Sequence, residues 1–292
     1  MVTDTAKRKT QDFVPDSQKM NRVRPATNAL FVALFVVLAA MAIIPVIFVF
    51  VVSISSETSI REVGYSFFPS ELSGTAYKFL WNERGTILNA LGISVLVTGV
   101  GTVLGLFLTT TMGYVLSRPV FKLKGFYTWV VFIPMIFNGG MLASYVINTN
   151  LLRLSDTVWA LILPLMSTSF GVFLMGQFIS AIPDDVLEAA RIDGAGEKYS
   201  FFKIVLPMMR PAWMTLMILT FISSWNVTGA QFTYSESMKM LPTMMQQINT
   251  GGIIRTGVTA AVSVLLMLPP IVIFLFCENS VVETMAYSGI KS

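Results

Sequence analysis

The most informative group of charged side chains in this sequence lies in residues 184–207, a polar segment between two long apolar runs. The side chains that usually carry catalysis are scarce: the chain has no histidine and a single cysteine, Cys277. This excludes Ser-His-Asp and Cys-His catalysis, an internal disulfide and any cysteine-based metal site. No Gly-Lys dipeptide occurs, so the loop that binds ATP phosphates in P-loop proteins is also missing. We therefore expect no catalytic residue, no metal and no cofactor in this chain, and energy from ATP would have to come from a partner.

The composition is typical of a protein that crosses a membrane several times. Apolar residues make up 54% of the 292 residues and charged residues only 12%, against roughly 25% charged in ordinary globular domains. The net charge of +4 comes from basic residues in particular loops, which membrane topology explains better than nucleic-acid binding. The expected class is an all-α integral membrane protein in a lipid bilayer, with no nucleic-acid partner.

Charge-free apolar runs locate the expected membrane spans. Each run has at least the roughly 20 residues needed to cross a bilayer core, and each should be a helix because lipid cannot satisfy free backbone groups. Six spans are expected, near residues 29–52, 86–117, 126–149, 157–182, 211–232 and 256–277. A cleaved signal peptide is the alternative for the first run, because Ala40-Met41-Ala42 mimics a cleavage site, but the apolar run continues well past it.

The distribution of lysine and arginine sets the expected orientation. An even number of spans places both termini on the same side of the membrane. With the N-terminus inside, the cytoplasmic segments hold 14 of the 20 basic residues, which is the bias that the positive-inside rule requires. We therefore expect both termini in the cytoplasm, residues 1–28 as a basic cytoplasmic tail, and residues 29–292 as the membrane domain.

Residues 183–207 should form two short helices on the cytoplasmic face. Asp184 and Asp185 favour the positive end of a helix, and Asp185 and Glu188 have the spacing of a capping box. Gly194 and Gly196 should end this first helix with a positive φ.

A second helix, over about residues 197–205, should stop ahead of Pro207. In the first helix the small Ala189 and Ala190 would allow close packing against a partner, and Glu188 could pair with a partner's basic residue. An amphipathic helix that only caps the bundle is the alternative.

The order of residues in this segment matches a known family motif. From Glu188, the sequence reads Glu-Ala-Ala, three residues, Gly, nine residues, then Ile-x-Leu-Pro ending at Pro207. This resembles the EAA loop of binding-protein-dependent ABC permeases, and Glu-Ala-Ala-Arg-Ile-Asp-Gly-Ala resembles their carbohydrate branch. The resemblance covers roughly residues 30–292, and it includes Gly113–Arg118, Asn138-Gly139-Gly140 with Tyr145, Leu151–Pro164 and Gly289-Ile290-Lys291. The Asn-Gly-Gly region is similar to a subgroup that takes up oligosaccharides from degraded polysaccharides.

The resemblance implies the permease subunit of a type I importer in the bacterial cytoplasmic (inner) membrane. Its implied partners are a second, homologous permease, two copies of an ABC ATPase subunit that bind ATP and Mg, and an extracytoplasmic solute-binding protein that delivers the oligosaccharide. The residues implied to couple the permease to the ATPase are Glu188, Ala189, Ala190, Asp193, Gly194, Ile204, Leu206 and Pro207.

Aromatic and amide side chains near the outer ends of the spans are candidates for the sugar path. A sugar ring has an apolar face and a polar rim, so such side chains suit it. The candidates are Asn138, Tyr145, Asn148, Trp225, Asn226 and Gln231. Packing between helices, or a place in the belt at the membrane interface, is the alternative for each of them.

The outer loop near residues 233–255 resembles the position of a loop that reaches into the binding protein. The candidate contacts are Tyr234, Glu236, Gln246, Gln247 and Asn249. A plain solvated loop is the alternative.

An ion-coupled secondary transporter or channel is the competing function. Such carriers generally need ionisable groups inside the membrane, and the six expected spans contain none. The sequence leaves the sugar open: uronate-containing fragments, such as those of alginate or pectin, and neutral sugars are both compatible with it.

Overall fold

The computed structural model describes residues 25–119, 121–137, 139–166, 168–229, 231–250 and 256–289. Regular structure in these ranges is helical, with no strand beyond one isolated bridge between Ser55 and Leu72. The chain divides into two compact units, Met1–Phe48 and Val49–Ser292. The expected all-α class is confirmed.

Most of the described part of the first unit is a single helix, α2 (Pro25–Ser53), which continues into the second unit. It is long and apolar enough to cross a membrane, and its side chains from Pro25 to Ile47 are exposed. An apolar helix surface of this kind suits contact with lipid tails or with another membrane helix.

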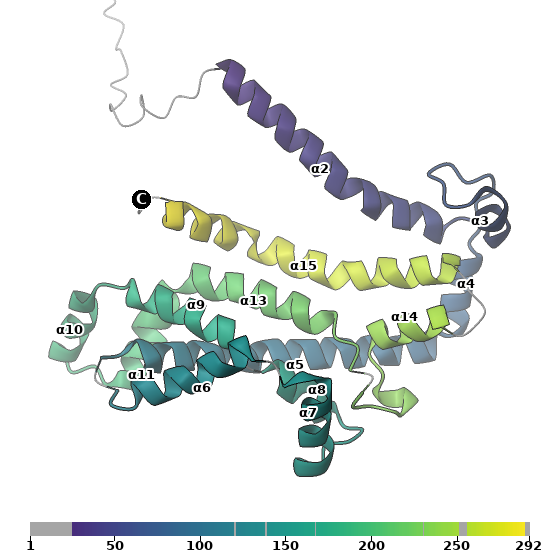
Figure 1. Cartoon of the computed structure of the whole chain (residues 1–292). Coiled ribbons are helices and arrows are strands. Elements are labelled where there is room, and N and C mark those ends of the chain that lie inside the picture. Colours follow the sequence, from purple (N-terminus) through teal and green to yellow (C-terminus); the bar gives the residue numbers. More distant parts are fainter. Residues whose placement is uncertain are drawn as a thin grey trace, which may run out of the picture. The chain divides into compact units, whose positions relative to one another are not determined.

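Four helices form the centre of the second unit. In Figure 1, α9 (Ser169–Ser180) and α13 (Arg210–Trp225) lie along α5 (Arg84–Ser117), and α15 (Thr256–Gly289) lies along α13. Close packing depends on small residues where α5 meets α9, as is usual for membrane helices. A Cβ atom added at Gly113 would lie 3.0 Å from the backbone nitrogen of Gly176 and 3.0 Å from the Met175 Cβ.

Two of these four helices, α9 and α13, belong to bent pairs. The pairs Val158–Leu165 with Ser169–Ser180, and Glu197–Met208 with Arg210–Trp225, are each apolar enough to cross a membrane when taken together. With these pairs the described residues contain up to five candidate spans. The second pair bends by 79°, so we take Arg210–Trp225 as the span and the preceding turns as part of segment 183–207.

The third expected span is not one helix. In its place are α6 (Lys124–Ile136) and α7 (Gly140–Val146), followed by a π-helical turn at Ile147–Leu151. The prediction of an unbroken helix over 126–149 is therefore wrong. Gly140 adopts φ +77°, which redirects the chain, and α6 with 13 residues is only about 20 Å long.

The fifth expected span is shorter than predicted. Helix α13 ends at Trp225, seven residues before the expected end at position 232. Asn226 follows it, and its side-chain Nδ2 donates a 2.8 Å hydrogen bond to the Ile222 carbonyl. An amide that caps the last turn in this way competes with continuation of the helix.

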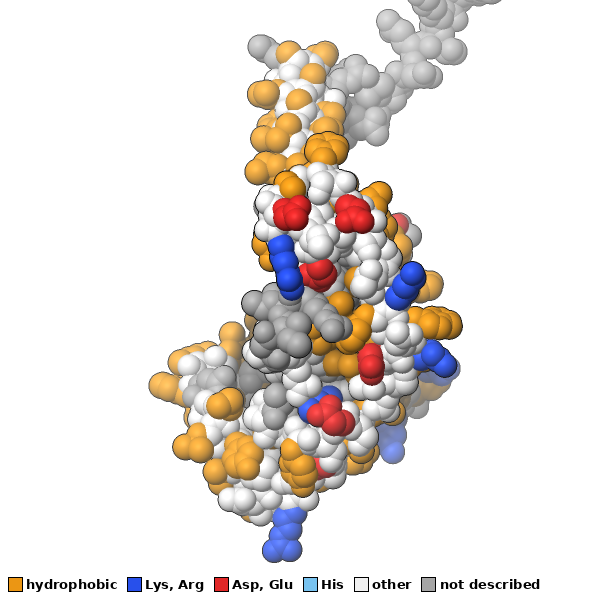
Figure 2. All heavy atoms as spheres, turned by 90° about the vertical axis from the view of Figure 1, so that its right-hand side faces the viewer, with side chains coloured by type: hydrophobic (Ala, Val, Ile, Leu, Met, Phe, Trp, Pro, Cys, Tyr) orange, Lys and Arg blue, Asp and Glu red, His pale blue; other side chains and the backbone are white. Residues whose placement is uncertain are grey.

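Short helices close the two ends of the second unit. At one end lie α3 (Glu57–Val63), α4 (Thr75–Asn82) and α14 (Leu241–Thr250), whose core includes Leu80, Leu241 and Val262. Figure 2 shows this end face-on, with acidic and basic side chains spread across it. At the other end lie α10 and α11 (Figure 1).

Candidate functional site

Helix α10 (Asp184–Ile192) forms the first half of segment 183–207. Its N-cap is Pro183, and no side chain caps its first turn. The predicted capping box is therefore wrong, because Asp185 lies inside the first turn instead of at the cap. Asp184 and Asp185 still favour the helix start, since carboxylates interact well with its positive end.

Helix α10 ends in a Schellman motif. The Gly194 N–H donates to the Arg191 carbonyl at 3.0 Å, and the Ala195 N–H donates to the Ala190 carbonyl at 2.9 Å. Gly194 has φ +82°, as this motif requires at its glycine. Gly196 has φ −74° and lies at the N-cap of the next helix. The expected positive φ is thus confirmed at Gly194 and wrong at Gly196.

The second half of the segment is helical from Glu197 to Met208. It comprises α11 (Glu197–Tyr199), a π-helical stretch (Ser200–Val205) and α12 (Leu206–Met208). The helix passes through Pro207, so the predicted stop ahead of this proline is wrong. The π-helical turns before Pro207 explain this difference, because the widened hydrogen-bond ladder accommodates a residue that has no N–H.

Helix α10 has one buried and one exposed face. Leu187 and Ala190 are buried, at 5% and 7% exposure, and Leu187 packs in a core with Phe201 and Val205. Glu188 and Ala189 are exposed, and Ile192 is 86% exposed. The Glu-Ala-Ala motif is therefore shared between the two faces of α10. Glu188 and Ala189 face outward, and Ala190 faces the second helix.

A chain of polar contacts ties this segment to α5. Glu197 accepts a hydrogen bond from the Tyr114 hydroxyl at 2.8 Å and forms a 3.1 Å ion pair with Arg191. The Tyr114 ring packs against Phe201 at 4.9 Å between centroids, and the Arg118 guanidinium lies 4.2 Å from the Tyr114 ring centroid. The Tyr114 hydrogen bond, together with Arg191, holds the pKa of Glu197 below its usual range, so this carboxylate is charged at neutral pH.

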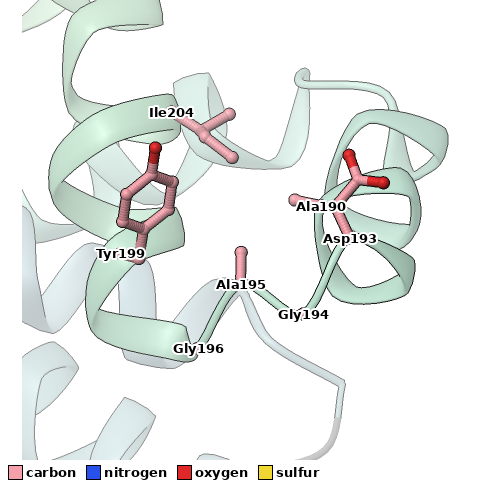
Figure 3. Close-up of a pocket in the computed structure, with 7 residues that line it drawn as sticks. All are labelled: Ala190, Asp193, Gly194, Ala195, Gly196, Tyr199 and Ile204. Carbon is pink, nitrogen blue, oxygen red and sulfur yellow. The ribbon is translucent and has the colours of Figure 1, made fainter.

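A hollow of about 460 Å³ lies between the two helices of the segment. Figure 3 shows Asp193 on the α10 side and Tyr199 on the α11 side, with Ala190, Ala195 and Ile204 between them. Of the other predicted coupling residues, Leu206 is half-buried and Pro207 is exposed. The structure thus gathers Ala190, Asp193, Gly194 and Ile204 around one concavity and leaves Glu188 on the outer face.

The sugar-path candidates on α7 and the following turn differ in exposure. Tyr145 is 44% exposed, whereas Asn148 is only 5% exposed. The Asn148 Nδ2 donates to the Ser144 carbonyl at 3.1 Å, which is a local structural use of this amide. Asn138 lies outside the described residues.

The candidates at and after the end of α13 also lie in different environments. Trp225 is 1% exposed, and its Nε1 donates to the Leu266 carbonyl of α15 at 2.9 Å, so this ring packs between two helices. Asn226 and Gln231 are exposed. Among the described candidates, no hydrogen bond or ring contact joins one of these side chains to another.

The candidates for the binding-protein contact are exposed. Tyr234 is 75% exposed, and Glu236, Gln246, Gln247 and Asn249 are exposed as well. Glu236 pairs with Lys239, and the Asn249 Oδ1 accepts a 2.7 Å hydrogen bond from the Thr259 hydroxyl.

One residue that the sequence reasoning missed anchors this loop. Asp156 accepts hydrogen bonds from the backbone N–H groups of Tyr234 at 3.1 Å and Ser235 at 3.0 Å, and also from the Ser235 hydroxyl. The Ser235 bonds, with that from Tyr234, lower the pKa of Asp156. Asp156 has φ +56°, a conformation that aspartate tolerates better than most residues. A lone aspartate beside a span was the available signal, but its partner lies 79 residues away.

A second hollow that the sequence reasoning missed lies at the end shown in Figure 2. It has a volume of about 520 Å³, and Glu57, Arg61, Lys78 and Asn82 are among its lining residues. The Glu57 Oε1 accepts a 2.9 Å hydrogen bond from the Gly257 N–H. This contact fixes the start of α15 against the loop between α2 and α5.

Comparison with known proteins assigns the family. Residues 90–283 match the model of the binding-protein-dependent transport system inner membrane component. The chain belongs to this family. It is therefore a multi-pass inner-membrane permease of an ABC transport system, as the motif in residues 188–207 led us to expect.

Relatives of the permease align along most of its length. Protein LplC of Bacillus subtilis (strain 168) is 28% identical over 289 residues, which cover 94% of this chain and 96% of the relative. The polygalacturonan/rhamnogalacturonan transport system permease protein YtcP of the same organism is 30% identical over 204 residues, which cover 70% and 71%. The arabinooligosaccharides transport system permease protein AraQ of Halalkalibacterium halodurans is 28% identical over 276 residues, which cover 92% and 99%.

A solved structure shares the fold. One chain of a bacterial ABC transporter involved in the import of the acidic polysaccharide alginate superposes with a TM-score of 0.74 at 22% identity. The match covers 88% of this chain and 98% of the other. The permease therefore has the type I ABC importer fold; the number of its spans and the side on which its termini lie stay predictions.

Proposed function

We propose that this permease forms half of the pore of an ATP-driven oligosaccharide importer and that α10 couples it to a separate ATPase. In this proposal two permeases form the pore, two copies of an ATPase subunit bind ATP and Mg, and an external binding protein delivers the sugar. The permease itself carries no ATPase site. Its family supports this division of labour, because the chain is the membrane component of a binding-protein-dependent system.

The observation that carries the proposal is the outward face of α10. Leu187 anchors the helix in the core of its own chain, while Glu188, Ala189 and the 86% exposed Ile192 point outward. A large exposed aliphatic side chain on a rigidly held polar helix suits a protein–protein contact. The short Ala189 side chain allows a partner backbone to come close.

The substrate proposal depends on the relatives. YtcP and AraQ are named for polygalacturonan or rhamnogalacturonan and for arabinooligosaccharides, so we propose an oligosaccharide derived from a plant or microbial polysaccharide. Uronate-containing fragments and neutral fragments are both represented in those names. The aromatic and amide candidates Tyr145 and Asn226 are proposed to line the path, and Tyr234 with Gln246 to meet the binding protein.

Purification and reconstitution test the proposal. The permease, extracted in mild detergent from its native membrane, should carry with it a second permease and an ATPase subunit, identified by mass spectrometry. In proteoliposomes the complex should hydrolyse ATP faster when the sugar-loaded binding protein is added. The proposed assembly would be contradicted if the chain is recovered alone, or if the binding protein does not change the rate of ATP hydrolysis.

A matched pair of sugars tests the substrate class. Oligogalacturonates and neutral arabino-oligosaccharides of equal length should be offered to the cognate binding protein and then to the reconstituted complex. Uptake of either one supports an oligosaccharide importer. Uptake of neither, with an intact response to some non-sugar solute, would refute the substrate proposal and leave the coupling proposal in place.

A further inference from the structure

The hollow between α10 and α11 has an apolar floor and an acidic rim. Ala190, Ala195 and Ile204 supply the apolar part, while the Asp193 carboxylate and Tyr199 stand on opposite sides (Figure 3). With about 460 Å³, against roughly 30 Å³ for each water of the liquid, the hollow has room for a long side chain. Its walls belong to two helices joined by the Gly194 turn, so its width is fixed by that turn.

The charges around the hollow favour a basic occupant. Asp193 lines the hollow itself. Across residues 184–207 five side chains are acidic (Asp184, Asp185, Glu188, Asp193 and Glu197) and three are basic (Arg191, Lys198 and Lys203). Arg191 is already paired with Glu197. Within the described part of the chain, Asp193 takes part in no ion pair. The carboxylate nearest to the hollow is thus available to a partner's cation.

We propose that this hollow is a socket for one arginine or lysine side chain of the ATPase subunit. The aliphatic stem would lie against Ala190, Ala195 and Ile204, and the charged head would meet the Asp193 carboxylate, with Tyr199 on the opposite wall. Long basic side chains suit such a site, because they bury their stems along apolar surface and keep the charged head at a polar rim. The inference rests on the proposed coupling of α10 to an ATPase, and it adds the chemistry of the contact.

Binding of the ATPase subunit to purified variants tests the socket. Asp193→Lys should weaken binding by at least tenfold, because it places a like charge at the rim. Ala195→Leu, which fills the hollow without changing charge, should weaken binding by a similar factor. Asp184→Lys is the matched control: it makes the same charge change at the opposite end of α10 from Asp193, at a residue that does not line the hollow, and should cost less than threefold.

A charge exchange identifies the occupant. Each surface arginine and lysine of the ATPase is replaced with glutamate and tested against the Asp193→Lys permease, and one replacement should restore binding at least tenfold. Co-purification of every permease variant with the second permease shows that the variant is folded. Wild-type affinity of both Asp193→Lys and Ala195→Leu, or no restoring replacement, would overturn the socket while the coupling proposal stands. If the unmodified permease does not bind the ATPase, the proposed function fails, and the socket fails with it.

Discussion

Replacement of Gly194 tests whether the geometry of the turn after α10 matters for coupling. Gly194 has φ +82°, and a Cβ atom built there meets nothing within 4 Å. The cost of a side chain is therefore conformational and not steric. A left-handed conformation costs an ordinary L-residue about 1–2 kcal/mol, and a β-branched residue more. If the turn rearranges instead, the Gly194 and Ala195 N–H bonds are lost, at about 0.5–1.5 kcal/mol each.

These magnitudes predict an order among substitutions. Gly194→Asn should be nearly silent because asparagine tolerates this conformation. Gly194→Ala should lower the equilibrium constant for forming the native turn about tenfold, and Gly194→Val should lower it by more. Gly196→Ala is the matched control: Gly196 has φ −74°, and its added Cβ also meets nothing within 4 Å. This control should leave the turn unchanged.

The assay compares two readouts in proteoliposomes: sugar uptake and the ATP hydrolysis stimulated by loaded binding protein. Both should fall in the order Asn, Ala, Val at position 194, while sugar binding to the isolated receptor stays unchanged. Equal transport by Gly194→Val and wild type would refute the link between the turn and coupling. An equal loss of transport in Gly196→Ala and Gly194→Ala would also refute this link, because the different φ angles of the two glycines would then have no effect on coupling.

Three further predictions concern the contacts that hold the fold. Gly113→Ala should lower the free energy of unfolding by about 1–3 kcal/mol through overpacking, seen as a lower melting temperature in detergent. Gly99→Ala in the same helix has open space at its Cβ and should leave the melting temperature unchanged. Tyr114→Phe and Glu197→Ala should each reduce coupled uptake, and the double variant should be less impaired than the sum, because both remove the same 2.8 Å hydrogen bond; additive losses would contradict this. The pKa of Asp156 is lowered in the folded state, so its hold on the loop should be complete above about pH 4, weaken progressively below that pH, and be lost as the pH falls through the folded-state pKa. The loss should appear as faster proteolysis of the loop, and a loop with the same resistance at every pH from 7 down to acid unfolding would contradict this.

The sequence predicts the long helices better than the short ones. Helices α5 and α15 include the charge-free runs over 86–117 and 256–277, so length and apolar character suffice to place them, although α15 also passes through Pro269 and Pro270 and continues to Gly289. The run over residues 126–149 is equally apolar, but Gly140 at φ +77° turns the chain, and no pattern of hydropathy distinguishes a flexible glycine from one that redirects a helix. Asn226 ends α13 early for a similar local reason.

The sequence likewise predicts only some features of the candidate site. The linear motif from Glu188 to Pro207 identifies the segment, the first helix and the Gly194 turn. It does not show that Ala190 faces inward, nor that Glu197 bonds to Tyr114 across 83 residues of sequence. Those features depend on how α10 and α11 pack against α5, which is tertiary information.

The packing explains how a force on α10 could reach the membrane helices. Leu187 inserts into the core that Phe201 and Val205 share with α5, α9 and α13, and Glu197 bonds to Tyr114 near the end of α5. Closely packed interiors shift as units instead of deforming smoothly. In the proposed importer, a pull by the ATPase on α10 would therefore move the ends of α5 and α13 together. In that proposal, coupling depends on the rigidity of the Gly194 turn and of the Glu197 contact.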